Sequence, residues 1–248
     1  MKNFSFFPRK TQLGRAALAF FIAVEGVDGA GKTTQVNLLA QRLRDRCPLP
    51  ALVLHEPGGT ALGEAIGQLL KHDFQVALSA EAELLLFLAC RAQLVREVIR
   101  PALESGHIVL CDRFAASTLA YQGYGRGLDI EQIRSMQAFA TDGLTPDLTI
   151  LLDVPANVGL KRKRDEVVST ANAVQFSLFD GSVYDRFHDE TAAFHQRVRE
   201  GYLKLAAAES HTQGSHTWAV IDGTPQPEPV FNKAWALIEA LVLAGNKG

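Results

Sequence analysis

The chain has 248 residues, of which 47% are hydrophobic and 21% are charged, and its formal net charge is -2. This length suits one large domain, or one domain with a mobile insert, and the composition is ordinary for a soluble globular protein. Because extended polyanion binders usually carry a strong excess of Lys and Arg, the charge balance disfavours a nucleic-acid-binding protein and requires any phosphate binding to be local.

The N-terminal residues, 1–18, are predicted to form a flexible leader, and residues 19–248 a single domain. The leader is basic, and the apolar stretch at 16–24 is far shorter than the ~20 residues that span a bilayer. A signal peptide would place its cleavage site inside the glycine-rich loop that follows. We therefore expect no membrane association.

Five short apolar runs, each bounded by turn or capping residues, are typical of parallel strands that are buried on both faces. They lie at residues 20–24, 51–54, 108–111, 148–152 and 218–221. Amphipathic segments that predict helices lie at 33–47, 81–103, 130–140, 191–208 and 231–243. The alternation predicts right-handed βαβ units in a doubly wound α/β fold, with ligands beyond the carboxyl ends of the strands.

Residues 161–189 interrupt this alternation. They begin with the basic run Lys161, Arg162, Lys163 and Arg164, and they continue through polar, weakly patterned sequence. Such a segment is either a lid that closes over phosphates or a disordered loop, and the pattern alone leaves both interpretations open.

The three cysteines, Cys47, Cys90 and Cys111, are widely spaced, and no CxxC occurs. This spacing argues against a disulfide framework or a zinc site and is typical of reduced thiols in a cytoplasmic protein. Cys90 and Cys111 lie in apolar runs, so we expect them in the core.

Eight residues between the first strand and the first helix match the motif GxxxxGK[ST]: Gly26, Val27, Asp28, Gly29, Ala30, Gly31, Lys32 and Thr33. Glycines let backbone N–H groups surround phosphate oxygens, and the helix N-terminus adds partial positive charge. Lys32 is expected to reach the β- and γ-phosphates, and the Thr33 hydroxyl to hold Mg²⁺. The loop and Thr34 are therefore predicted to bind ATP.

A P-loop alone does not identify the substrate. A GTPase would be expected to carry an NKxD motif, which the sequence lacks, and a motor or transport ATPase usually needs a longer chain. Arg113, directly after a predicted strand, and the arginines of residues 161–189 favour a small kinase.

Six groups of residues, in this order along the chain, resemble those of bacterial thymidylate kinases. They are the P-loop with Asp28; 55–60 (HEPGGT) with 62–64; 85–93 (LLFLACRAQ); 111–114 (CDRF) with 117–123 (STLAYQG) and 125–127; 146–148 with 152–155 (LDVP); and 185–187 (DRF) with 194–195 and 197–202. The resemblance runs from about residue 20 to residue 243, and six groups in the same order are specific.

This resemblance implies a nucleoside-monophosphate-kinase-like P-loop fold with three layers, a parallel central sheet and a lid at about 161–189. It implies that the protein uses ATP and Mg²⁺ to convert dTMP to dTDP for dTTP biosynthesis. It also implies a homodimer, for which the helix at 81–103 could supply the surface, although that helix could equally belong to the core.

For the acceptor, the resemblance implies that Asp28 contacts the deoxyribose 3′-hydroxyl, Phe87 stacks on thymine and Arg91 donates to a base carbonyl. Phe87 and Arg91 are four residues apart and so share a helix face. A solvated loop acid is the alternative for Asp28. Taken without the resemblance, Phe87 is more typical of a core aromatic. The resemblance also implies that the remaining contacts to the base, the sugar and the phosphate come from Pro57, Gly58, Arg113, Thr118, Tyr121 and Gln122.

For the transfer step, the resemblance implies catalytic roles for a set of charged residues: Asp28, Lys32, Arg113, Arg162 and Arg164. Arg162 and Arg164 match arginines of the lid, and the variable positions of the P-loop contain no arginine. Asp112 is expected to bind Mg²⁺ with Thr33, directly or through water, although a structural ion pair is the alternative. Lid closure would exclude water from the reaction.

The chain departs from the family pattern at His55, where arginine is usual, at His188, where glutamate is usual, and around Glu166, where the lid is less basic. We expect these changes to affect lid motion and rate more than the class of substrate.

Two other functions remain open. One is a related P-loop nucleotide or nucleoside kinase that acts on another pyrimidine acceptor, such as dUMP, dCMP or thymidine. The other is a catalytically silent nucleotide-binding regulator, against which the intact Lys32, Thr33, Asp112 and Arg113 argue. A nucleic-acid-dependent ATPase is disfavoured by the size and charge of the chain.

Overall fold

A parallel five-stranded sheet lies at the centre of the computed structural model, which describes residues 19–47, 49–71, 78–173, 190–209 and 217–245. The strands are β1 (Phe20–Glu25), β2 (Ala51–His55), β3 (Ile108–Asp112), β4 (Leu148–Asp153) and β5 (Thr217–Asp222). Their order is β2-β3-β1-β4-β5. All five correspond to predicted strands. The predicted leader, residues 1–18, lies outside the described residues.

The central strand β1 supplies side chains to two separate cores, because neighbouring residues of a strand point to opposite faces. Ile22 and Val24 pack in one hydrophobic cluster, and Phe21 and Ala23 pack in another. All four are buried, as the prediction of a sheet covered on both faces requires.

The edge strands are less buried than the apolar runs predicted. Val53 of β2 is 38% exposed and Val220 of β5 is 51% exposed. The expectation of burial on both faces was wrong for these two strands, which form the two edges of the sheet.

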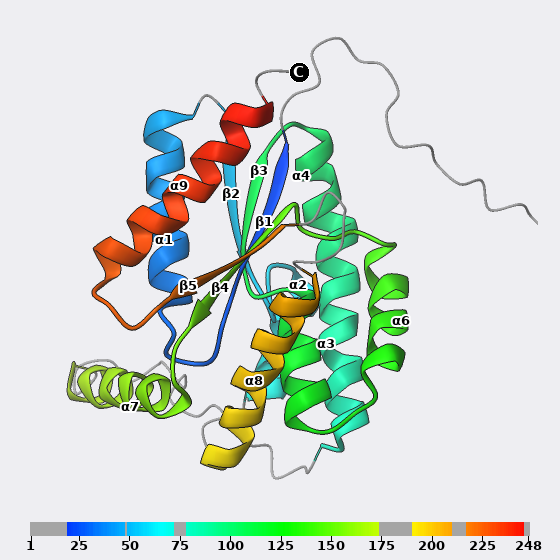
Figure 1. Ribbon diagram of the computed structural model, residues 1–248. Coiled ribbons are helices and arrows are strands. Elements are labelled where there is room, and N and C mark those ends of the chain that lie inside the picture. The colour runs from blue at the N-terminus through cyan, green and yellow to red at the C-terminus, as the bar shows by residue number, and fades with distance from the viewer. Residues whose placement is uncertain (1–18, 48, 72–77, 174–189, 210–216, 246–248) are drawn as a thin grey trace, which may run out of the picture.

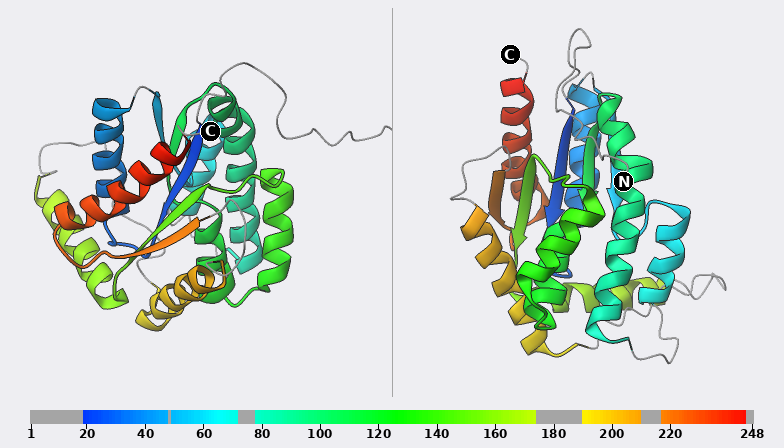
Figure 2. Two further views of the ribbon diagram at one scale, coloured as in Figure 1. Left: turned by 45° about the horizontal axis from the view of Figure 1, so that its top comes forward. Right: turned by 90° about the vertical axis from the view of Figure 1, so that its right-hand side faces the viewer.

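Helices form a layer on each side of the sheet (Figures 1 and 2). On one side α1 (Lys32–Arg46) packs along α9 (Pro227–Gly245). On the other side α3 (Ala80–Leu94), a π-helical segment η1 (Val95–Ile99) and α4 (Arg100–Glu104) run on continuously. Against α3 pack α2 (Ala61–Lys71) and α6 (Ile130–Thr141). The three-layer α/β fold is thus confirmed.

The remaining helices surround the carboxyl ends of the strands. They are the short α5 (Ala115–Thr118), the π-helical segment η2 (Leu119–Gly125), α7 (Ala156–Ala173) and α8 (Ala192–Glu209). α8 packs against η2, β4 and β5. Within the described ranges, no helix has the length and apolar character needed to cross a bilayer.

Helix α7 differs from the expectation for the lid. Residues 161–173 belong to this helix rather than to a loop, and residues 174–189, with His188 and the DRF group, lie outside the described residues. Residues 161–173 are mostly polar and show no clear apolar stripe. The sequence therefore did not predict this helix, because an apolar period of 3.6 residues is the main sequence signal for a helix.

Candidate active site

The point where the chain order reverses in the sheet lies at β1. The chain leaves β1 toward β2 and β3 on one side and later reaches β4 on the other. Ligands of such sheets bind beyond the carboxyl ends of the strands at this point. A cavity of about 920 Å³ opens there, lined by residues that include the P-loop from Asp28 to Thr34 and both Asp112 and Arg113.

The phosphate-binding loop joins β1 to α1 through Gly31, whose φ of 88° is in the left-handed region that favours glycine. Lys32 follows it and is buried, and its Nζ donates to the carbonyl of Val27 at 2.9 Å. Burial, together with repulsion from Arg113, lowers the pKa of Lys32 to about 8, although Asp112 pulls in the opposite direction. A bound polyphosphate would favour the charged form of this amine.

A pair of oxygen ligands lies beside Lys32. The Thr33 hydroxyl donates to Oδ2 of Asp112 at 2.6 Å, which joins the start of α1 to the end of β3. Hydroxyl and carboxylate oxygens suit Mg²⁺, which usually takes few protein ligands and completes its shell with phosphates and water. Among the described residues no cluster of three or more acidic, His or Cys side chains could hold a metal by itself. The pair therefore fits a nucleotide-bound Mg²⁺.

Arg113 lines the same cavity. Its φ of 71° is unusual for a residue other than glycine. Its guanidinium donates to Oδ1 of Asp28 at 2.5 Å, to the carbonyl of Gly26 at 3.1 Å and to the Tyr121 hydroxyl at 3.2 Å. Burial alone would raise the pKa of Asp28, but the charges of Arg113 and Lys32 outweigh it and lower this pKa to about 2.

The buried acid Glu25 is linked to Arg113 through two shared hydrogen-bonding partners, Ser117 and Tyr202. Glu25, at the end of β1, is fully buried and accepts from the Phe114 N–H at 2.8 Å, the Ser117 hydroxyl at 2.6 Å and the Tyr202 hydroxyl at 3.0 Å. Burial raises the pKa of Glu25, against the lowering effect of the hydrogen bond from Ser117 and the charge of Arg113. Ser117 and Tyr202 in turn accept from Nη1 of Arg113.

The roles of Glu25, Ser117 and Tyr202 were not predicted from the sequence. The signal that could have pointed to Glu25 is its position, since it is an acid directly at the carboxyl end of a buried strand and directly before the P-loop. Ser117 and Tyr202 lie inside two of the family-like groups, but nothing in their spacing shows that they meet.

The far end of the cavity is lined by Pro57, Phe87, Thr118 and Gln122 together with Tyr121. These residues come from the loop after β2, from α3, from α5 and from η2. The structure thus brings together most of the residues predicted to contact the acceptor. Gly58 is buried and is not one of the lining residues.

Arg91 is also absent from the cavity lining and is only 1% exposed. It donates to the Glu56 carboxylate at 2.6 Å, to the Thr118 hydroxyl at 2.8 Å and to the carbonyl of Phe114 at 3.1 Å. Burial raises the pKa of Glu56, against the lowering effect of Arg91. Arg91 therefore contacts Thr118, which lines the cavity, but does not line the cavity itself. It forms a buried ion pair with Glu56 that the sequence did not indicate.

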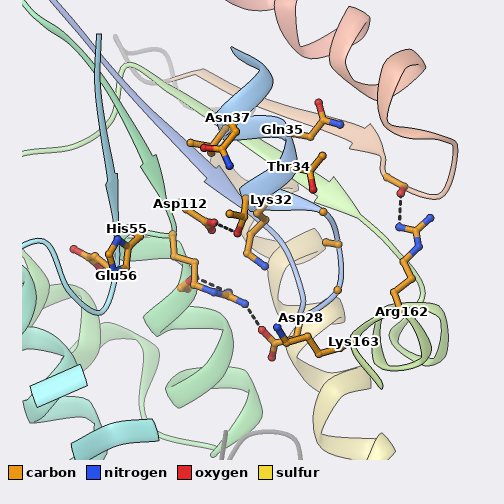
Figure 3. A pocket seen from close by; sticks show the side chains of 18 of the residues that line it. Asp28, Lys32, Thr34, Gln35, Asn37, His55, Glu56, Asp112, Arg162 and Lys163 are labelled. Carbon is orange, nitrogen blue, oxygen red and sulfur yellow. Dashed lines mark hydrogen bonds and ion pairs between the residues drawn. The ribbon is translucent and has the colours of Figure 1, made fainter. Parts of the chain in front are cut away.

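Helix α7 supplies two basic residues to the opposite end of the cavity, Arg162 and Lys163. Arg162 donates to the carbonyl oxygens of Gly223, at 2.8 Å, and Thr224, at 2.6 Å, in the loop after β5. Figure 3 shows Arg162 at this end, Lys163 extending from α7 toward Asp28, and His55 and Glu56 at the other end. Arg164, the second predicted lid arginine, is exposed and is not one of the lining residues.

Comparisons with known proteins agree with this geometry. Residues 24–233 match the family model described as thymidylate kinase. The thymidylate kinase of Desulfovibrio desulfuricans is 46% identical over 92% of this chain and 99% of its own length, and that of Carboxydothermus hydrogenoformans is 44% identical over 89% and 97%. The solved structure of thymidylate kinase from Ehrlichia chaffeensis superposes with a TM-score of 0.66 at 31% identity, covering 89% of this chain and 98% of the other. The chain belongs to the thymidylate kinase family.

Proposed function

We propose that this chain transfers the γ-phosphoryl group of ATP to the phosphate of dTMP and releases dTDP and ADP. The observation that carries the proposal is that Lys32, the Thr33–Asp112 pair and Arg113 line one cavity in a chain of the thymidylate kinase family. A nucleotide-binding regulator that had lost catalysis would have no need for this combination.

The donor nucleotide is proposed to occupy the end of the cavity between the P-loop and α7. The P-loop residues 26–34 would surround the phosphates, as the motif predicts. Gly223, Pro225 and Gln226, in the loop before α9, line the same end. Arg162 and Lys163 bring positive charge to this end, which favours a triphosphate.

The acceptor is proposed to occupy the end lined by Pro57, Phe87, Thr118 and Gln122. Phe87 would stack on the base, and Arg91, which does not line the cavity, would act on the acceptor through Thr118, whose hydroxyl accepts from Nη1 of Arg91. Arg113 would hold the dTMP phosphate, because a guanidinium suits bidentate phosphate contacts. With these positions the two phosphate groups meet between Lys32 and Arg113.

In the proposed transfer an oxygen of the dTMP phosphate attacks the γ-phosphorus in line. A new O–P bond forms as the bond from phosphorus to the β–γ bridging oxygen breaks, and ADP leaves. Lys32 and Arg162 would stabilise the charge on the transferring group and the leaving phosphate. Mg²⁺, held by Thr33 and Asp112, would supply further charge neutralisation. Arg164 could take part only in an arrangement of α7 that brings it to the cavity.

A homodimer in the cytoplasm is part of the proposal. Helices α2, α3 and α6 pack together and expose large apolar side chains: Leu62, Leu69, Leu85 and Phe139. Phe139 is 91% exposed, and a contiguous patch of such side chains would mark an interaction surface. The three free cysteines would suit the reducing cytoplasm that the proposal names. Light scattering of the wild type and of Phe139→Glu tests the dimer, which the charge should weaken.

The test of the activity is ADP production from ATP and Mg²⁺ with a panel of acceptors: dTMP, dUMP, dCMP, AMP, thymidine and none. The proposal expects dTMP to stimulate ADP release far more than the other acceptors. Preference for another pyrimidine would favour a related kinase. ATP binding without stimulation by any acceptor would favour the silent regulator.

A further inference from the structure

Glu83, on α3, is an acid that the transfer step does not use and that is only 1% exposed. Its carboxylate accepts from Nε of Arg126 at 3.2 Å and from Nη2 of Arg126 at 3.0 Å. It accepts a third hydrogen bond, at 2.8 Å, from the amide nitrogen Nε2 of Gln122. A buried carboxylate is costly unless it is paired and hydrogen-bonded in this way.

Arg126 holds this carboxylate in place from a fixed position. Its Nη1 donates to Glu190, two residues before α8, and its guanidinium lies 4.8 Å from the centre of the Phe194 ring. Two acids and one aromatic ring therefore restrain Arg126. Glu83 in turn cannot turn away from Gln122 without leaving a partly buried guanidinium short of one partner.

The contact with Glu83 decides which end of the Gln122 amide faces the cavity. A carboxylate paired with a guanidinium accepts hydrogen bonds and donates none, so the NH₂ group of Gln122 must face Glu83. Gln122 nevertheless lines the cavity, at the end proposed for the acceptor base. The amide oxygen of Gln122 is thus the atom left to meet a ligand, and this oxygen can only accept.

We propose that Glu83 is a positioning residue that determines base specificity, because it holds the Gln122 oxygen toward the acceptor base. Thymine and uracil carry an N–H at position 3 and can donate to this oxygen. Cytosine has a lone pair at the same position, which would face another lone pair. The inference rests on the proposed function and adds to it the group that selects against a cytosine nucleotide.

The change Glu83→Gln tests this role. A glutamine at this position offers one oxygen and one NH₂ group to three donor hydrogens, so it no longer fixes the orientation of the Gln122 amide. The measurement is a competition in one reaction, with equal dTMP and dCMP, in which the ratio of dTDP to dCDP is followed. This ratio does not depend on how much of the enzyme is active.

The wild type should favour dTMP strongly, and E83Q should lower the ratio by about tenfold or more, the cost of one mismatched hydrogen bond. Glu190→Gln is the matched control, because it removes the other acid from Arg126 and leaves the contact from Glu83 to Gln122; its ratio should match the wild type. If E83Q does not fold, Glu83→Asp keeps the charge beside Arg126 but withdraws the carboxylate from Gln122, and the same fall is expected.

A ratio in folded E83Q or E83D that equals that of the wild type would overturn the role of Glu83. An equal fall in E190Q would overturn it too, since the effect would then belong to Arg126. A wild type that phosphorylates neither nucleotide is a different result, because it overturns the proposed function itself.

Discussion

The backbone of Gly159, in the first turn of α7, lies directly against the backbone of Gly29 in the P-loop. A Cβ atom added to Gly29 would lie 2.0 Å from the carbonyl oxygen of Gly159, and one added to Gly159 would lie 2.3 Å from the carbonyl oxygen of Asp28. Only glycine at both positions permits this approach. The phosphate-binding loop is therefore joined to the helix that carries Arg162 and Lys163.

The change Gly159→Ala should separate α7 from the P-loop and impair ATP use. Because small misplacements of positioning groups are costly, we expect kcat/KM for ATP to fall by about tenfold to a hundredfold. Steady-state kinetics with varied ATP provides the measurement. Gly67→Ala is the control, since a Cβ atom there would make an ordinary contact 3.5 Å from the Pro57 carbonyl. Equal kinetics for G159A and the wild type would contradict the prediction.

The affinity for ATP should fall as the pH rises above about 8. In the free protein Lys32 loses its proton at about this pH, because burial and Arg113 lower its pKa. Bound phosphates need the charged amine, so the ATP affinity should be about tenfold lower at pH 9 than at pH 7. Calorimetric titration with ATP and Mg²⁺ at several pH values measures this dependence.

Lys32→Arg is the control for that pH dependence. Arginine stays protonated over this range, so the variant should bind ATP with little change between pH 7 and pH 9, whatever its absolute affinity. The assignment to Lys32 would be wrong if the variant and the wild type showed the same slope.

Asp28 should contribute stability that acid removes. Its pKa is lowered from 3.8 to about 2 in the folded protein, so its contribution is complete above about pH 4 and is lost as the pH falls through 2. The contribution amounts to about 2 kcal/mol at neutral pH and to about half of that at pH 3. Urea unfolding of the wild type and of Asp28→Asn at both pH values measures it. A constant difference between the two proteins would contradict the prediction.

Arg91 should matter for folding as well as for substrate. The change Arg91→Met would leave the Glu56 carboxylate, whose side chain is 4% exposed, without its buried partner. The expected loss in the free energy of unfolding is about 3–5 kcal/mol. Loss of Arg91 raises the pKa of Glu56 further, so the folded state binds that proton more tightly and the loss should be smaller at pH 5 than at pH 8.

Replacing both partners provides the control for this pair. Arg91→Met combined with Glu56→Leu should recover most of the lost stability, because no unpaired charge then remains. A single R91M variant as stable as the wild type would show that the pair has no structural role.

The sequence predicted the sheet and the P-loop well because each has a strong local signal. Continuous apolar runs identified all five strands, and the spacing of Gly26, Gly31, Lys32 and Thr33 identified the phosphate-binding loop. Helix α2 was not predicted, because Gly63 and Gly67 weaken its helical propensity and other elements stabilise it.

Sequence patterns did not predict the contacts between residues that are far apart in the sequence. Glu25 meets Tyr202 across 177 positions, and Arg91 meets Glu56 across 35. The pairing of these polar groups depends on how α3, α5 and α8 pack around the sheet. Residue spacing records only local periodicity, so neither partner could be assigned in advance.

The most direct test of the central claim is to follow the phosphoryl group itself. The protein is incubated with Mg²⁺, dTMP and ATP labelled with ³²P in the γ-phosphate, and the labelled products are separated. The proposed function predicts that the label appears in the β-phosphate of dTDP and that little appears as inorganic phosphate. Label found only in inorganic phosphate, or only in unreacted ATP, would contradict it.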